Sequence, residues 1–183
     1  AWEEFLPAFG VVTGTHIAAA VAARAAQLGR QPGPDDLEKA ALAQVAIAAE
    51  RRATDYVAAV QTLHRLGRTV GQFFETVDLV VTPTLGTVPL PIGQLSADTD
   101  DLAAFGALAG RVSQFLGWVN ATGLPAMSVP LHWSAEGLPV GTQVVARFGA
   151  EDTLFAVARQ LEEAAPWWHR RAPMAGGSAT PAG

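Results

Sequence analysis

The stretch Asn120-Ala121-Thr122-Gly123-Leu124-Pro125-Ala126-Met127-Ser128-Val129-Pro130 decides how the chain folds. A polar turn punctuated by glycine and proline runs there into a short apolar strand. A second turn, Glu136-Gly137-Leu138-Pro139, leads into another strand from Val140 to Arg147. Each proline in these segments removes a backbone donor and fixes φ, so the two strands cannot form a regular ladder throughout. The pattern predicts a β-hairpin whose bends are set by the sequence.

Helices are predicted before this hairpin. An alanine-rich helix is expected from His16 to Leu28, with Thr15 as its N-cap. Asp35 is expected to cap a second helix through a capping box with Glu38, and Thr54 to cap a third.

A single strand is predicted between these helices and the hairpin. The β-branched run 77–82, ended by Pro83, is typical of a strand buried on both faces. Residues 84–100 then form a loop longer than compact connections usually are, and loops of this length tend to carry function.

The remaining segments add two helices. Asp100 or Asp101 is expected to cap the helix before the Asn120 turn, and residues 151–165 predict a last amphipathic helix stopped by Pro166. Alternation of helices and strands indicates an α/β fold. Three strands are few for at least four helices, which indicates a piece of a larger sheet. Residues 1–173 are therefore assigned to the C-terminal part of one domain. Residues 174–183 are expected to form a flexible tail.

Composition narrows the class of protein. Half of the 183 residues are hydrophobic and 16% are charged, which is typical of a globular domain. The net charge of −5 argues against nucleic acid or an anionic membrane as partner, and no apolar run is expected to reach the length of a membrane span. The absence of cysteine from this sequence excludes disulfides and thiolate metal sites and is consistent with a cytoplasmic protein.

A search of the sequence for catalytic patterns finds little. There is no Gly-x-Ser-x-Gly motif, the four histidines share no metal-ligand spacing, and Lys39, the only lysine, is best interpreted as a solvated surface residue. No catalytic residue, metal or cofactor is therefore expected in this sequence. Thr13, Thr15 and His16 at the expected helix start could face a polar ligand through free backbone donors, although a capped helix start with an exposed histidine is the favoured interpretation.

Four segments in order resemble the C-terminal part of amidase signature family enzymes. They are residues 73–84 with Thr82-Pro83-Thr84, residues 120–130 with Asn-x-x-Gly-x-Pro-Ala, residues 137–143 with Gly-Leu-Pro-x-Gly-x-Gln, and the closing helix and tail at 151–173. Each motif alone is weak, but four in the same order are specific, and together they span nearly the whole chain.

The resemblance implies a large mixed β-sheet with helices on both sides. It also implies amide hydrolysis through a serine nucleophile, a second serine joined by a cis peptide, and a lysine base. In family members these three lie in the N-terminal part, which this sequence does not contain. The expected partners are therefore the N-terminal part of the same enzyme and a small-molecule amide, with a homodimer left open. The chain alone is expected to be inactive.

The resemblance further implies that this part of the enzyme forms walls of the substrate pocket. The candidates are Thr13, Thr15, His16, Trp118 and Asn120. A core position is an equally good interpretation for Trp118, and Asn120 is expected to hydrogen-bond backbone around its turn.

Three alternatives remain at this point. The first is an amidotransferase A-type subunit. Glutaminyl-tRNA amidotransferase A subunits resemble a pattern with an acidic residue shortly before the position of Asn120. In this sequence that position falls at Ser113, and no carboxylate lies between Asp101 and Asn120. A pocket for the ammonium of a free amino acid is therefore disfavoured. The others are a non-catalytic α/β module that binds a small molecule, and an interaction subunit with an exposed sheet edge.

Overall fold

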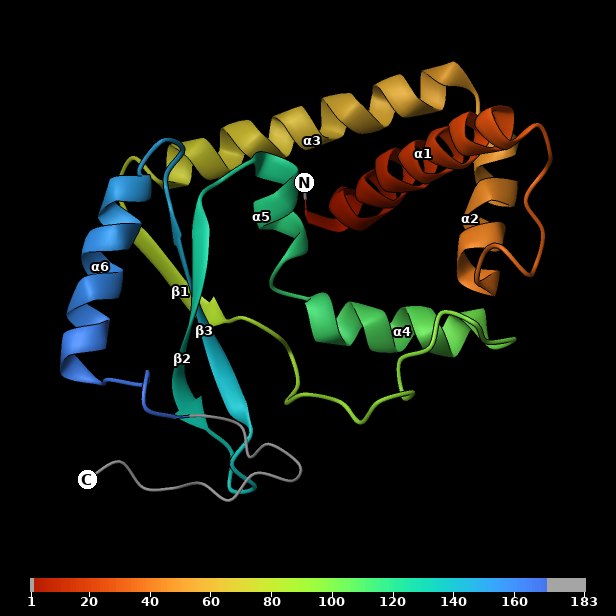
Figure 1. Ribbon diagram of the computed structural model, residues 1–183. Helices are drawn as coiled ribbons and strands as arrows, with labels where there is room; N and C mark the ends of the chain where they lie inside the picture. The colour runs from red at the N-terminus through yellow and green to blue at the C-terminus, as the bar shows by residue number, and fades with distance from the viewer. Residues whose placement is uncertain (1, 171–183) are drawn as a thin grey trace.

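The computed structural model describes residues 2–170, with side chains from residue 3 onward, and contains six helices and three strands in that range (Figure 1). In chain order these are α1 Trp2–Leu28, α2 Lys39–Ala49, α3 Ala53–Phe73, β1 Leu79–Pro83, α4 Leu102–Ser113, α5 Gly117–Thr122, β2 Ala126–Trp133, β3 Pro139–Ala146 and α6 Glu151–Ala164. The α/β class is confirmed.

The predicted hairpin forms the main part of the sheet. Strands β2 and β3 pair antiparallel, β1 pairs antiparallel with the other edge of β3, and the order is therefore β1-β3-β2. The register shifts between Val129 and His132, where Pro130 cannot donate to a ladder, and Pro139 occupies the first position of β3. The prolines thus bend the hairpin as the sequence predicts.

Helices cover both faces of this sheet, as expected. Leu154 of α6 packs on Val144 and Ala146 on one face, and Phe74 and Val119 pack on Val145 on the other. Val145 is completely buried. Each fully buried side chain of this size stabilises the fold by about 1.5–3 kcal/mol.

The start of α1 differs from the prediction. Thr15 does not cap a helix, because α1 begins at Trp2 and continues through it. The Thr13 and Thr15 hydroxyls donate to carbonyls four residues earlier, at Phe9 and Val11. Phe5 and Ala8 are buried one turn apart, and this packing outweighs the hydrogen bond lost at Pro7 in the second turn.

Two further caps were predicted at the wrong residue. Helix α2 begins after Glu38, which makes no side-chain cap bond, and Asp35 lies outside the helix. Helix α3 begins after Arg52, whose backbone N–H donates to Asp55, so Thr54 is not the cap. For α4 the structure selects Asp101, whose carboxylate accepts the Ala104 N–H.

The strand and turn that flank α4 and α5 also differ in detail. Val81 in β1 is 63% exposed, so this strand is not buried on both faces. Asn120 lies inside α5 rather than in a turn, and the turn follows at Gly123, which has a φ of 68°. Residues 171–183, which include the expected tail, lie outside the described residues, and the domain assignment stays a prediction.

One helix contradicts the expectation that no apolar run reaches membrane-span length. Residues Glu3–Leu28 of α1 are long and apolar enough to cross a membrane by length and composition. Core helices of globular proteins and signal sequences near an N-terminus pass the same test. Here 17% of the apolar window is buried, and α1 packs along α3 and against α2 (Figure 1).

Candidate functional site on the sheet

The register of the sheet brings three of the motif segments side by side. Thr82 of β1 lies opposite Gln143 of β3, which lies opposite Ser128 of β2. The pairing continues past β1, because the Thr84 N–H donates to the Gly141 carbonyl oxygen at 2.8 Å. Side chains two residues apart in a strand share a face, so these residues form one row on the sheet face that carries Val145. We call Thr82, Thr84, Ser128 and Gln143 the polar row.

Gln143 is the buried centre of the polar row, with 3% of its surface exposed. Its amide nitrogen donates to the Thr82 hydroxyl and to the Phe115 carbonyl oxygen, both at 3.1 Å. The second bond ties the central strand to the segment between α4 and α5. A buried amide requires such partners, because an unpaired one costs about 1–3 kcal/mol.

The Thr84 and Ser128 hydroxyl oxygens lie 2.6 Å apart at the open end of the row. Gly141 lies beneath them, and a Cβ there would come within 2.7 Å of both oxygens. The hydroxyl pair therefore requires glycine at this position.

Gly86 brings the loop after β1 against the end of α4. Its N–H donates to the Val112 carbonyl oxygen at 2.9 Å. A Cβ at Gly86 would overlap the Arg111 carbonyl oxygen, which is backbone and cannot move aside easily. The loop therefore follows a fixed path away from the polar row.

A hollow of about 340 Å³ opens over this end of the row. All of the residues that line it are uncharged: Thr84, Leu85, Thr87, Pro89, Ser128, Pro130, Pro139, Val140 and Gly141. The Thr87 hydroxyl oxygen is buried without a hydrogen-bond partner in the part of the chain that the structure describes. The hollow thus combines apolar walls with hydroxyls that can pair with a neutral polar group.

This site can bind and orient a molecule, but the described residues do not make it a nucleophile centre. A serine nucleophile needs a base within hydrogen-bond reach, and the hydroxyl of Ser128 is paired with another hydroxyl. Lys39 forms an exposed ion pair with Asp100 at 2.8 Å, as expected of a surface lysine.

The three candidates on α1 do not line this hollow. Thr13 and Thr15 use their hydroxyls within the helix. His16 is exposed, and its Nε2 lies 3.2 Å from the Tyr56 hydroxyl oxygen, with the two rings edge to face. Their assignment as substrate-binding residues stays a prediction.

The two candidates on α5 are also outside the hollow. Trp118 is partly buried and packs against the core cluster of Phe74, Val119 and Val145. Asn120 is exposed, and its backbone N–H donates to the Leu116 carbonyl oxygen within the helix. The polar row was missed as a site, although the motifs Thr82-Pro83-Thr84 and Gly141-Thr142-Gln143 contain most of it.

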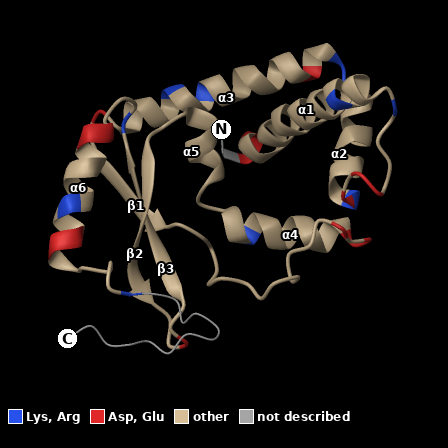
Figure 2. Cartoon of the chain, in the orientation of Figure 1, with Lys and Arg blue, Asp and Glu red and all other residues tan. Residues whose placement is uncertain are grey.

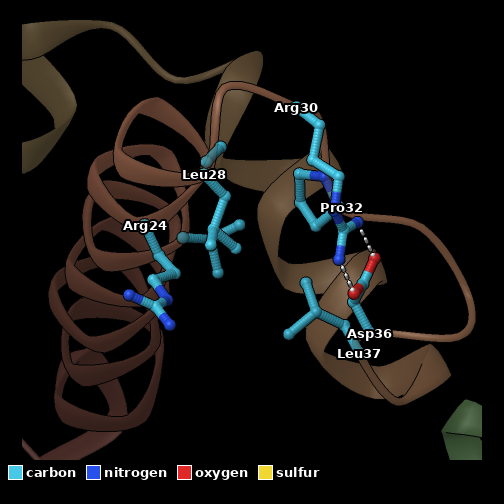
Figure 3. Close-up of a pocket in the computed structure, with 8 residues that line it drawn as sticks. Arg24, Leu28, Arg30, Pro32, Asp36 and Leu37 are labelled. Atoms are coloured by element: carbon cyan, nitrogen blue, oxygen red, sulfur yellow. Dashed lines mark hydrogen bonds and ion pairs between the residues drawn. The ribbon is translucent and has the colours of Figure 1, made fainter.

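A second hollow, of about 210 Å³, lies between the end of α1 and the loop before α2 (Figure 3). Leu28 and Leu37 contribute apolar walls, and Arg30 faces Asp36 across its rim with two hydrogen bonds of 2.7 and 2.6 Å. Hydrogen bonds from Arg30 and from the Gly33 N–H hold the pKa of Asp36 far below its usual range. Arg30 and Asp36 neutralise each other, so neither charge needs a ligand in this hollow.

Comparison with known proteins identifies the family. The family model described as Amidase matches residues 17–155. The chain is 32% identical over 180 residues to the 6-aminohexanoate-cyclic-dimer hydrolase of Paenarthrobacter ureafaciens, covering 92% of this chain and 36% of that protein. It is 40% identical over 113 residues to a fatty acid amide hydrolase of Medicago truncatula, covering 61% of this chain and 18% of that protein. The chain belongs to the amidase family.

Solved structures agree with this assignment. A structure of 6-aminohexanoate cyclic dimer hydrolase superposes with a TM-score of 0.82 at 32% identity, covering 91% of this chain and 36% of that one. A bacterial aryl acylamidase of the amidase signature family shares the fold, with a TM-score of 0.71 at 18% identity. The chain therefore spans about a third of the length of these relatives.

Proposed function

We propose that this chain is the C-terminal part of an amidase that hydrolyses the C–N bond of small carboxylic amides. The match to the amidase family over residues 17–155 is the observation that supports this proposal most directly. In the proposed reaction a serine oxygen takes the acyl group and the amine leaves; water then releases the carboxylate and frees the serine. The serine pair and the lysine base lie upstream of Ala1 in the complete enzyme, whose location we expect to be cytoplasmic.

The contribution of this chain is a wall of the substrate pocket at the polar row. The hollow there presents the Thr84–Ser128 hydroxyl pair between proline walls, and Thr87 lines it with its hydroxyl oxygen buried. Hydroxyls can accept an amide N–H or donate to an amide carbonyl, whereas the uncharged lining offers nothing to balance an ionic group. We therefore expect neutral amides to bind better than charged ones. Thr13, Thr15, His16, Trp118 and Asn120 stay candidates for more distant parts of the wall.

The test compares the full-length enzyme with the 183-residue chain. We expect the full-length enzyme to release amine from neutral amides and to be labelled by a fluorophosphonate upstream of Ala1, while the chain alone does neither. Hydrolysis by the chain alone would overturn the proposal. Binding of amides by a full-length protein that shows no turnover would instead support the non-catalytic module.

A further inference from the structure

The chain exposes more surface than a compact protein of its size. Its accessible surface is 12,474 Å², whereas a compact monomer of 19.1 kDa exposes about 8,400 Å². Allowing about 1,700 Å² for the residues outside the described range, the most that a segment of their mass can expose, leaves an excess of roughly 2,400 Å². An excess of this size on one side corresponds to an obligate interface.

The excess includes a continuous apolar segment. Residues 79–97 contain no charged side chain, and Figure 2 shows β1 and the loop that follows it without acidic or basic colour until the red end of the loop just before α4. Five large hydrophobic side chains of this segment are exposed: Val81, Leu85, Val88, Ile92 and Leu95. Ile92 is fully exposed, at 108% of its reference surface. Large apolar side chains exposed along one uncharged segment are typical of an interaction site.

The apolar segment is fixed at both ends of its loop. The Gly86 N–H donates to Val112 near the sheet, and the Ala97 carbonyl oxygen accepts the Ala40 N–H at 3.0 Å on the far side. Between these anchors the loop crosses from the sheet past α4 toward α2 (Figure 1). Backbone hydrogen bonds to the rest of the chain therefore anchor the loop that carries these hydrophobic side chains.

We infer that residues 79–97 are a docking surface for the upstream part of the same amidase. This inference rests on the proposed function, because the cyclic-dimer hydrolase that the chain matches is nearly three times its length. Leu85 and Thr87 line the hollow at one end of the segment. Docking there brings upstream residues to the rim of the polar row, so that the substrate pocket is completed at the junction of the two parts.

Thiol accessibility in the full-length enzyme tests this inference without using activity. The matched variants are Ile92→Cys in the docking surface and Phe155→Cys on the outer face of α6, where 76% of the Phe155 surface is exposed. This chain contains no native cysteine, so labelling is compared with the parent enzyme. We expect an uncharged maleimide to react at least about tenfold more slowly at position 92 than at position 155, because a docked side chain reacts only after local opening.

Equal labelling rates in the folded enzyme would overturn the inference. Protection at position 92 that disappears on dilution would also overturn it, since the occupant would then be a second copy of the chain. If Ile92→Cys does not fold, Val88→Cys serves in its place. A protected position 92 in an enzyme that hydrolyses no amide would leave the docking surface standing while the proposed reaction fails.

Discussion

The side-chain amide of Gln143 on the central strand donates to the carbonyl oxygen of Phe115, 28 residues earlier in the chain, at 3.1 Å. The same nitrogen donates to Thr82 on the neighbouring strand. One buried side chain therefore joins two strands and the segment before α5. It also fixes the inner end of the polar row.

Replacement of Gln143 tests the contribution of these two hydrogen bonds to stability. Gln143→Leu keeps most of the volume but leaves the Phe115 carbonyl and the Thr82 hydroxyl without this donor. We expect the free energy of unfolding to fall by about 1–3 kcal/mol. Urea unfolding of the full-length enzyme measures the change, with Gln160→Leu on the exposed side of α6 as control. Equal effects of the two substitutions would contradict a role for the Gln143 bonds.

Gly86→Ala tests the close contact between the loop and α4. The new methyl group would overlap the Arg111 carbonyl oxygen, so the loop must move and the protein loses about 1–3 kcal/mol of stability. Gly110→Ala is the matched control, because a Cβ there meets nothing within 4 Å and helix propensity should raise stability by up to about 1 kcal/mol. Thermal unfolding midpoints should move in opposite directions; a shift of the same sign in both variants would argue against the contact.

Asp101→Ala and Asp100→Ala distinguish the two residues that the sequence offered as caps of α4. Asp101 accepts the Ala104 N–H at 2.9 Å, so its loss should cost about 0.5–2 kcal/mol. Asp100 makes only an exposed ion pair with Lys39, and its replacement should have a smaller effect. Circular dichroism during urea unfolding measures both. A larger loss for Asp100→Ala would reverse the cap assignment.

The Arg30–Asp36 pair makes a prediction about pH. Its hydrogen bonds lower the pKa of Asp36 in the folded state, so the pair stabilises the fold fully above the unfolded pKa of about 3.9 and loses this effect as pH falls toward the folded value. Asp36→Asn should lower the melting temperature at pH 7 and at pH 5, and the difference from the parent should shrink below pH 4. Asp35→Asn, which leaves the pair intact, is the control. A difference that grows in acid would contradict the assignment.

Ser128→Ala tests the substrate wall. Removing one hydroxyl of the Thr84–Ser128 pair should raise KM about fivefold, the equivalent of one hydrogen bond, with kcat changed less than about twofold. Steady-state assays of the full-length enzyme on a neutral amide measure this, and Thr54→Ala in the exposed first turn of α3 is the control. A loss of several orders of magnitude in kcat would instead assign Ser128 a catalytic role.

Local patterns predicted the elements whose ends are set by nearby residues. Pro139 and Gly137 specify the hairpin within a few positions, and Gly137 has the φ of 79° that its turn requires. The helix at 151–164 follows from its amphipathic spacing. By contrast, Thr15 has the chemistry of a cap but lies mid-helix, because contacts of α1 with α3, which is distant in sequence, extend the helix to Trp2.

The polar row could not be located from spacing alone. Thr84 and Ser128 are 44 residues apart and meet only because β1 pairs with β3, while β3 pairs with β2. The motifs pointed to the right segments, but the strand order decides which of their residues are neighbours. The helix start predicted at Thr13, Thr15 and His16 lies inside α1, and the other two candidates, Trp118 and Asn120, lie on α5.

The central position of β3 has a consequence for synthesis on the ribosome. Strand β1 leaves the ribosome before its only partner strand among the described residues, β3, has been made. The intervening residues up to Ala146 take about 3–12 s to translate at 5–20 residues per second, and during that time β1 and its loop have no strand to pair with. Within the described part of the chain, β1 thus waits for seconds until the strand that pairs with it is made.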